Sequence, residues 1–213
     1  MKLTVFGATG GIGGHVVRQA LDAGHTVRAV VRDRARLAVP DQPALHVVTV
    51  DGLTSPGPLE PAVLGSDAVV SGIGPSSRGA AGVAAVATRA ITGAMTAAGV
   101  RRIVAVSAVP VGPIPPEEAF VRRRIAYPIV RRVLRPVYDD LAAMEADLRR
   151  SGTQWTVVRP PRLDDKPLTG RYRLEFGANV ANGAFVSRAD VAHAMLALMA
   201  DPRAIDEAVG IAR

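Results

Sequence analysis

The fold of this chain is decided by a stretch near its N-terminus, KLTVFGATGGIGG at residues 2–14. Residues 2–6 are a short run of β-forming side chains, and residues 12–21 carry apolar side chains at helical spacing. Between them three glycines follow the pattern G-x-x-G-x-x-G, and they are Gly7, Gly10 and Gly13. A glycine loop that joins a strand to a helix is typical of dinucleotide binding, because free amides at the helix N-terminus face the phosphates.

Each glycine of this loop has a predicted role. Gly7 permits a tight turn, Gly10 lets the backbone approach the pyrophosphate, and Gly13 lets the helix pack against the strand. No Gly-Lys-Ser/Thr follows, so this is not a phosphate loop of the nucleotidase kind. The predicted cofactor-binding residues of the segment are Gly7, Thr9, Gly10, Gly11, Ile12 and Gly13.

Strand-like and helix-like segments alternate along the rest of the chain. Helical patterns cover residues 80–98 and 139–150, and a capping box at residues 187–190 opens a last helix to Met199. The alternation predicts right-handed βαβ units. We therefore expect an α/β, single-domain Rossmann fold over residues 1–213, with a mostly parallel sheet and helices on both faces. The further strands are expected at residues 26–31, 45–50, 68–70, 102–106 and 155–158, with an edge strand at 210–212.

One region breaks the alternation. Four prolines at residues 110–116 exclude a continuous helix or a central strand, so we expect a loop that covers the site. A helix is predicted after it, over residues 117–124, and Tyr127-Pro128 is predicted to interrupt that helix.

The choice of cofactor depends on the end of the second strand. An NAD site usually offers an acid to the ribose there, but this chain has Arg32, where a guanidinium pairs well with a 2′-phosphate, and Arg36 to close a second side. Asp33 leaves the alternative that it turns toward a ribose hydroxyl. We favour NADP(H) over NAD(H).

Two further segments follow predicted strands at the edge where open α/β sheets bind ligands. Asp51 and Gly52 are expected beside the adenine. Ile73 and Gly74, within Gly72-Ile73-Gly74-Pro75, are expected under the adenosine ribose and the diphosphate.

With these residues in place, the chain resembles the atypical short-chain dehydrogenases/reductases, and within them the biliverdin reductase B, or NADPH flavin reductase, branch. The resemblance covers nearly the whole chain, and its last block is the most specific. The matching pieces are residues 6–10, Val31-Arg32-Asp33 with Arg36, Val106-Ser107-Ala108, Ser151-Gly152, and Pro160-Pro161 with residues 165–170.

The resemblance implies that the nicotinamide lies near Ser107 and the segment Pro160-Pro161. It also implies that Ser107 forms a hydrogen bond on the substrate side. A histidine follows the proline pair in that branch, but this chain has Arg162, for which we expect contact with an anionic substrate or phosphate. Ser107 and Arg162 are the predicted catalytic residues.

The amino-acid composition limits which metals, nucleic acids or membranes we expect the chain to bind. There is no cysteine, and the four histidines show no metal-ligand spacing, so we expect no metal site. The net charge is +7, but the arginines of residues 122–135 lack the interleaved aromatic side chains of a nucleic-acid surface. No apolar run is long enough for a signal peptide or a transmembrane helix. We expect a cytoplasmic monomer or small homo-oligomer without membrane or nucleic-acid partners.

Three functions fit these observations. The first is an NADPH-dependent reductase that transfers hydride to a flavin, quinone or similar planar acceptor. The second is a non-catalytic NAD(P) sensor that resembles the NmrA-like regulators, and the missing Tyr-x-x-x-Lys dyad favours it. The third is an epimerase with tightly held NAD, a class that usually needs that tyrosine and a larger substrate domain. We favour the reductase because the block at residues 160–170 matches.

Overall fold

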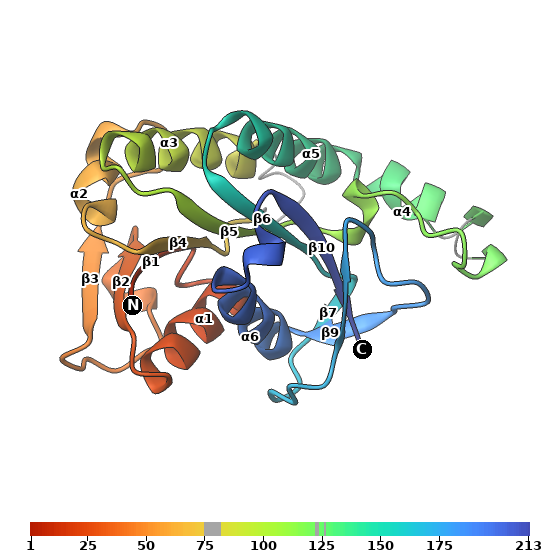
Figure 1. Cartoon of the computed structure of the whole chain (residues 1–213), viewed down its shortest axis with the longest axis horizontal. Coiled ribbons are helices and arrows are strands. Elements are labelled where there is room, and N and C mark those ends of the chain that lie inside the picture. Colours follow the sequence, from red (N-terminus) through yellow and green to blue (C-terminus); the bar gives the residue numbers. More distant parts are fainter. Residues whose placement is uncertain (75–81, 122–123, 126) are drawn as a thin grey trace.

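The computed structural model describes residues 1–74, 82–121, 124–125 and 127–213 (Figure 1). Its strands are β1 (Lys2–Phe6), β2 (Thr26–Val31), β3 (Leu45–Thr49), β4 (Ala68–Ser71), β5 (Arg102–Val106), β6 (Gln154–Arg159), β7 (Arg162–Asp164), β8 (Arg173–Phe176), β9 (Phe185–Ser187) and β10 (Glu207–Ala212). Its helices are α1 (Gly11–Asp22), α2 (Glu60–Val63), α3 (Val83–Ala97), α4 (Tyr127–Val133), α5 (Arg135–Arg150) and α6 (Arg188–Met199).

The main sheet has eight strands in the order β3-β2-β1-β4-β5-β6-β10-β8. All neighbours pair in parallel except β10 and β8, which are antiparallel. The order 3-2-1-4-5-6 is that of a dinucleotide-binding Rossmann sheet, and it reverses direction between β1 and β4. The predicted fold class is therefore confirmed, and the carboxyl ends of β1 and β4 mark the place where such sheets bind their ligand.

Helices cover both faces of the sheet. Figure 1 shows α1 and α6 on one face, with α3 and α5 on the other. Each face has its own core, because side chains of a strand alternate between the two sides. Leu3 and Val5 pack toward α1 and α6, whereas Phe6 and Val69 pack toward α3 and α5.

The chain differs from the sequence-based expectations at three places. Residues 210–212 belong to β10, which is not an edge strand but lies between β6 and β8. Residues 117–119 are not helical, and part of that predicted helix, residues 122–123, lies outside the described residues. Tyr127-Pro128 does not interrupt a helix but begins α4, since proline is tolerated in a first helical turn, where its missing N–H costs no hydrogen bond. The first residues of the helix expected over 80–98, residues 80–81, also lie outside the described part, and α3 covers the rest of it to Ala97.

Three short strands had no signal in the sequence. β7 and β9 pair with each other in a separate two-stranded sheet, and β8 covers the outer side of β10. Each has only three or four residues, too few to show the alternation that marks a strand.

Arg102 joins the sheet to the end of α6. Its buried guanidinium donates to the carbonyl oxygens of Met199 (3.0 Å) and Leu198 (2.7 Å), and to the hydroxyl of Thr156 (2.8 Å). A cation at the C-terminus of a helix satisfies carbonyls that lack helical partners and complements the helix dipole. The buried guanidinium therefore holds the C-terminal end of α6, the helix that packs beside α1, against the sheet.

We predict that Arg102→Met lowers the free energy of unfolding by about 3 kcal/mol, because the buried carbonyls of α6 lose their donors. Urea titration followed by circular dichroism measures the change. The matched control is Arg101→Met, next in the chain and exposed, for which we expect a change within about 0.5 kcal/mol. Equal changes in unfolding free energy for the two substitutions would contradict a stabilising contact between Arg102 and the end of α6.

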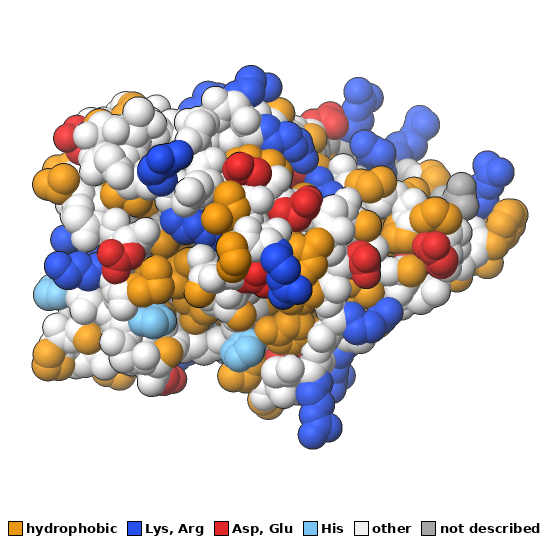
Figure 2. All heavy atoms as spheres, in the orientation of Figure 1, with side chains coloured by type: hydrophobic (Ala, Val, Ile, Leu, Met, Phe, Trp, Pro, Cys, Tyr) orange, Lys and Arg blue, Asp and Glu red, His pale blue; other side chains and the backbone are white. Residues whose placement is uncertain are grey.

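The exposed surface is uneven. Figure 2 shows hydrophobic and arginine side chains together at the end of the molecule to which α4 belongs, and Figure 1 shows α4 projecting away from the sheet. None of the residues of α4 is buried. Within the described part of the chain, no helix is both long and apolar enough to cross a membrane.

Candidate functional site

The glycine loop brings the N-terminus of α1 against the end of β1. Gly7 has a φ of 73°, and its carbonyl oxygen accepts a hydrogen bond from the N–H of Gly10 (2.9 Å). A Cβ on Gly13 would overlap the carbonyl group of Gly7, so a side chain there is excluded. The turn and the close packing predicted for Gly7 and Gly13 are thus both present.

The first turn of α1 has no side-chain cap, and no acidic residue lies in it. Two other helices that start at this edge are capped: Asp140 accepts from the N–H groups of Ala84 and Ala85 of α3, and Ser187 caps α6. Like α1, α5 has no side-chain cap. An uncapped helix N-terminus keeps donors and a partial positive charge for an anion. A dinucleotide diphosphate therefore fits this loop.

We predict that Gly13→Ala separates α1 from β1, lowers the free energy of unfolding by about 2–3 kcal/mol and weakens NADPH binding, because the new methyl group meets backbone. The matched control is Gly14→Ala. A Cβ there lies 3.5 Å from the carbonyl oxygen of Ala8, an ordinary contact, and alanine favours a helix by about 0.5–1 kcal/mol.

Thermal unfolding and NADPH fluorescence titration measure both variants. If Gly13→Ala binds NADPH as tightly as Gly14→Ala, the close approach of the helix is not needed for the cofactor.

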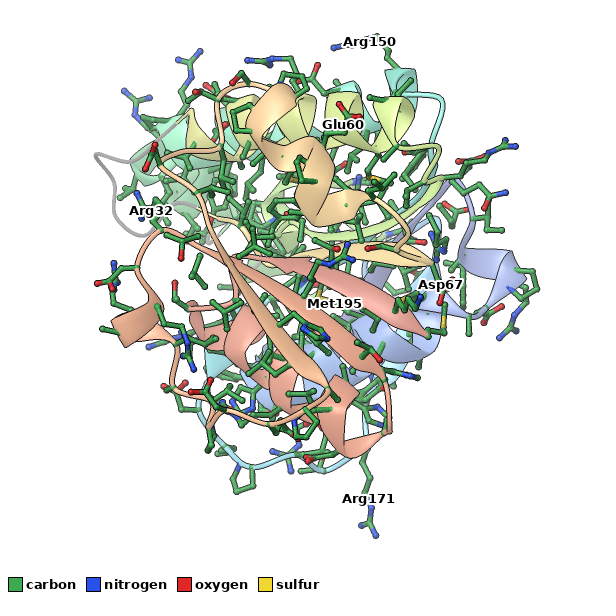
Figure 3. All side chains as sticks on the ribbon, turned by 90° about the vertical axis from the view of Figure 1, so that its left-hand side faces the viewer. Arg32, Glu60, Asp67, Arg150, Arg171 and Met195 are labelled. Atoms are coloured by element: carbon green, nitrogen blue, oxygen red, sulfur yellow. The ribbon has the colours of Figure 1, made fainter. Side chains whose placement is uncertain are left out.

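Arg32 and Arg36 lie past the end of β2, and both are exposed. Figure 3 shows Arg32 at the opposite end of the sheet from Asp67, which precedes β4, so Arg32 belongs to the carboxyl edge. Neither arginine forms a hydrogen bond or ion pair with another described residue. Arg34, between them, is paired with Asp41. Two guanidinium groups at this edge that have no partner among the described residues fit a 2′-phosphate.

Asp33 is engaged elsewhere. Its Oδ1 accepts the N–H of Ala35 (2.9 Å) and caps the short 3-10 turn at Arg34–Arg36. This hydrogen bond fixes the turn that carries Arg36 and directly follows Arg32, and it occupies one of the carboxylate oxygens that would reach a ribose hydroxyl.

The other residues predicted for the adenosine half lie at the same edge. Asp51 is exposed after β3, next to the end of β2, because the N–H of Val50 donates to the carbonyl of Val31 (3.0 Å). After β4, Gly72 packs against Gly13, and a Cβ on it would come within 3.1 Å of the Gly13 nitrogen. Gly52 is half-buried, Ile73 is buried and Gly74 is exposed. Thr9, Gly10 and Gly11 are exposed within the loop, and Ile12 is buried.

Ser107 lies directly past the end of β5, and its N–H continues the ladder to Val158 (2.8 Å). The side chain is buried, yet within the described part of the chain its Oγ has no hydrogen-bond partner. Buried hydroxyls almost always have a partner, so an orphan of this kind indicates a ligand atom or a water. Pro160 and Pro161 follow β6, and the carbonyl of Pro160 accepts from the N–H of Val109 (3.0 Å).

An apolar pocket of about 570 Å³ is lined by Ala108, the residue that follows Ser107, but not by Ser107 itself. It is bounded by segments that follow β5 and β6, by α4 and the start of α5, and by the segment before β9. Its aromatic walls are Tyr127, Tyr138 and Phe185. The remaining lining residues are Ala108, Val109, Pro110, Val130, Leu134, Pro160, Pro161, Arg162, Gly183 and Ala184. A concave apolar site with a few polar groups is typical of a small-molecule site.

Two polar groups of the pocket are Arg162, whose position is fixed by a ring contact, and Tyr138, whose protonation is affected by burial. The guanidinium of Arg162 lies 5.5 Å from the ring centroid of Phe185, in cation–π contact, and the side chain is exposed at the rim. Burial raises the pKa of the Tyr138 phenol, so this group stays protonated at neutral pH. A tyrosine of the Tyr-x-x-x-Lys type needs the opposite shift, because a neighbouring lysine has to lower its pKa.

A buried ion pair that the sequence did not reveal supports this pocket. Arg159, the last residue of β6, donates to both carboxylate oxygens of Glu145 on α5 (3.0 and 2.5 Å). A Cβ on Gly112 would come within 2.5 Å of the Arg159 guanidinium. Asn179 donates to the carbonyls of Val109 (3.0 Å) and Pro113 (2.8 Å). The first half of the proline-rich loop is therefore fixed against the site, where Pro110 lines the pocket.

Arg188 is a second residue near the cofactor site that the sequence did not reveal. It is the first residue of α6, and its side chain passes over Gly11, where a Cβ would come within 2.6 Å of the arginine Cδ. Its guanidinium forms an ion pair with Asp165 (2.6 Å). The only signal was the capping box, which places residue 188 at a helix start but does not show that α6 packs beside α1.

Asp190 anchors the segment that carries Asp165. Its carboxylate accepts from the N–H groups of Thr169 (2.8 Å) and Gly170 (2.9 Å), and from the hydroxyls of Thr169 (2.9 Å) and Ser187 (2.9 Å). Burial alone would raise the pKa of this carboxyl, but the four hydrogen bonds together outweigh burial and lower the pKa below its usual 3.8.

We predict a pH-dependent contribution from this group. A carboxyl whose pKa is lower in the folded chain stabilises it fully above the unfolded value, and the contribution is lost as the pH falls through the folded value. The difference in unfolding free energy between the native chain and Asp190→Asn is therefore constant from pH 7 to about pH 5 and shrinks below about pH 4. Urea titrations across this range measure it.

Asp22→Asn is the control, because Asp22 is exposed at the end of α1 and forms no hydrogen bond with the side chain or backbone of another element in the described chain, and we expect its unfolding free energy at pH 7 to change by less than about 0.5 kcal/mol. A difference for Asp190→Asn that stays constant down to pH 3 would contradict the hydrogen-bonded carboxylate.

Two further side chains near these segments have structural positions. Trp155 is buried in the core beneath α5, where the Arg149 guanidinium lies 5.5 Å from its ring. Asp164 accepts from the N–H of Lys166 (3.2 Å) in a turn. Among the described residues, no group of three or more histidine, aspartate or glutamate side chains is arranged to hold a metal ion.

Comparison with known proteins adds to this geometry. A family model described as NAD(P)H-binding matches residues 7–202. The chain is 28% identical over 204 residues to a Bacillus subtilis protein named uncharacterized sugar epimerase YhfK, covering 92% of this chain and 87% of that protein.

Two solved structures show the same fold. A short-chain dehydrogenase/reductase from Veillonella parvula in complex with NADP has a TM-score of 0.81 and 21% identity, covering 100% of this chain and 94% of that one. ChuY, an anaerobillin reductase from Escherichia coli O157:H7, has a TM-score of 0.78 and 20% identity, covering 100% of this chain and 97% of that one.

Proposed function

The chain belongs to the NAD(P)H-binding family, and we propose that it is an NADPH-dependent reductase that transfers hydride to a flavin, quinone or similar planar acceptor. The observation that carries the proposal is the apolar, aromatic-walled pocket, whose lining begins at Ala108. The preceding residue, Ser107, has a buried hydroxyl without a hydrogen-bond partner among the described residues. Flat aromatic acceptors bury their faces in such a pocket and need few hydrogen bonds.

The residues at the carboxyl edge fit NADP(H). The glycine loop would hold the diphosphate, and Arg32 with Arg36 would hold the 2′-phosphate. Asp51 and Gly52 would lie beside the adenine, with Ile73 and Gly74 under the ribose. The engagement of Asp33 in its own turn supports NADP(H) over NAD(H). A relative of the same fold was crystallised with NADP.

The bound cofactor would supply the hydride, and the residues of the chain would orient the nicotinamide and the acceptor relative to each other. Ser107 would hydrogen-bond the nicotinamide or the acceptor, and Pro160 with Pro161 would form the wall against which the ring rests. Arg162 would hold an anionic group of the acceptor at the rim of the pocket. Positioning two planar rings face to face is the main requirement of such a transfer.

No acid in the pocket is needed for the proton. Tyr138 is protonated, but burial raises its pKa and makes it a weak acid. The pocket opens to water at its rim, and water protonates a reduced flavin or quinone. The lack of an activated tyrosine is also the observation that favours the second candidate, an NAD(P) sensor without catalysis.

Turnover separates the two candidates. We expect saturable oxidation of NADPH, followed at the nicotinamide absorbance, with FMN or with a member of a quinone panel. Tight NADPH binding without turnover of any acceptor would support the sensor instead.

We predict that Arg32→Ala raises the KM for NADPH about 10- to 100-fold, as expected for the loss of a charge-assisted hydrogen bond, and leaves the KM for NADH within about twofold. The matched control is Arg34→Ala, two residues away, whose guanidinium is already paired with Asp41. An equal loss with both cofactors, or an equal effect of Arg34→Ala, would contradict a 2′-phosphate contact at Arg32.

A further inference from the structure

The helix α4 and the segment before it expose an unusual amount of apolar surface. Phe120 is 72% exposed, Val121 63%, Ile125 52%, Ile129 57% and Val133 53%. A monomer rarely leaves large apolar side chains together in this way, so such a patch usually marks an interaction surface. We call Phe120, Val121, Arg124, Ile125 and Tyr127–Val133 the α4 arm.

The α4 arm is also basic. The sequence from residue 119 to residue 138 contains six arginines and no aspartate or glutamate. Of the described ones, Arg124, Arg131 and Arg132 are exposed and form no ion pair with another described residue. These arginines stand beside the exposed apolar side chains, and Figure 2 shows basic and apolar side chains together with some acidic atoms at the projecting end. The acidic residues nearest in the sequence are Glu117-Glu118 and Asp139-Asp140.

Three kinds of partner could cover the exposed apolar side chains of the α4 arm, but they differ in the charge that they bring to its arginines. In a symmetric dimer both copies bring the same arginines to one interface, so like charges accumulate there. An acidic peptide would match the arginines but not a wide apolar surface on a projecting helix. An anionic lipid surface matches both, because phosphates pair with guanidinium groups while apolar side chains enter the boundary of the acyl chains.

We propose that the α4 arm docks on the surface of a membrane that contains anionic phospholipid. Ile129 and Val133 lie one turn apart on α4 and would enter the lipid boundary, and Arg131 and Arg132 would pair with headgroup phosphates. This is surface docking of an exposed element and needs no spanning helix. It departs from the expectation of no membrane partner, which came from the lack of a long apolar run in the sequence.

The docking has a consequence for the acceptor. Tyr127, Val130 and Leu134 line the pocket, so the helix that would lie on the membrane is also a wall of the proposed acceptor site. A lipid-soluble quinone would then enter from the membrane side. This consequence rests on the proposed reductase function, whereas the docking itself does not.

Sedimentation with vesicles tests the docking without any turnover. One set of vesicles contains phosphatidylcholine alone, and the other contains phosphatidylcholine and phosphatidylglycerol at about three to one. We expect the chain to sediment with the second set only, and its binding to weaken as salt is added. Arg131→Glu with Arg132→Glu, and separately Ile129→Ser with Val133→Ser, are each expected to weaken binding at least about tenfold.

The matched control is Leu64→Ser with Arg101→Glu, which changes an exposed leucine and an exposed arginine near the amino ends of β4 and β5. We expect it to bind as the native chain does. NADPH titration shows whether each variant is folded, because none of the changed residues lies in the glycine loop or the pocket lining.

Two results would overturn the proposal. One is no binding, or equal binding to both kinds of vesicle, by the native chain at low salt. The other is a concentration-dependent dimer, seen by light scattering, that the α4 substitutions abolish, since the arm would then be covered by a second copy. Either result leaves NADPH turnover in solution unaffected, so failure of the docking is distinct from failure of the reductase.

Discussion

The contact between Gly13 and the carbonyl group of Gly7 is the constraint on which the site depends. Because Gly13 has no side chain, the N-terminus of α1 reaches the end of β1, and the same absence at Gly72 lets the end of β4 close in beside it. This approach leaves the first turn of α1 uncapped at the point where the sheet order reverses. The other candidate site residues follow neighbouring strands and lie on either side of this helix end.

From this point the site extends along one edge of the sheet. Strand order alone sets the sequence of groups, with Arg32 past β2, the glycine loop past β1, Ser107 past β5 and the proline pair past β6. A charged end for a phosphate and an apolar end for a ring therefore lie on either side of the helix terminus. The buried pair of Arg159 and Glu145 stiffens the apolar end, which keeps the pocket walls in position.

The fold and the position of the arginines and the glycine loop at one edge of the sheet could be predicted from the sequence because their signals are local. The glycine spacing, the strand ends and the arginines after β2 each lie within a few residues of the feature they create. Arg188 and Arg159 could not be predicted, because their roles depend on α6 lying beside α1 and α5 lying behind β6, contacts between segments far apart in the chain. The edge position predicted for residues 210–212 is wrong for a related reason. β8 covers that strand through an antiparallel pairing, and its four residues show no readable pattern.

The first experiment is a crystal structure of the chain with NADP⁺, because the proposed roles of the site residues depend on where the cofactor lies. We expect the 2′-phosphate between Arg32 and Arg36, the diphosphate on the first turn of α1, and the nicotinamide within hydrogen-bond or contact distance of Ser107 and Pro160, facing the apolar pocket. A nicotinamide directed away from Ser107, with the pocket still separated from the ring, would contradict the assignment of that pocket to the acceptor.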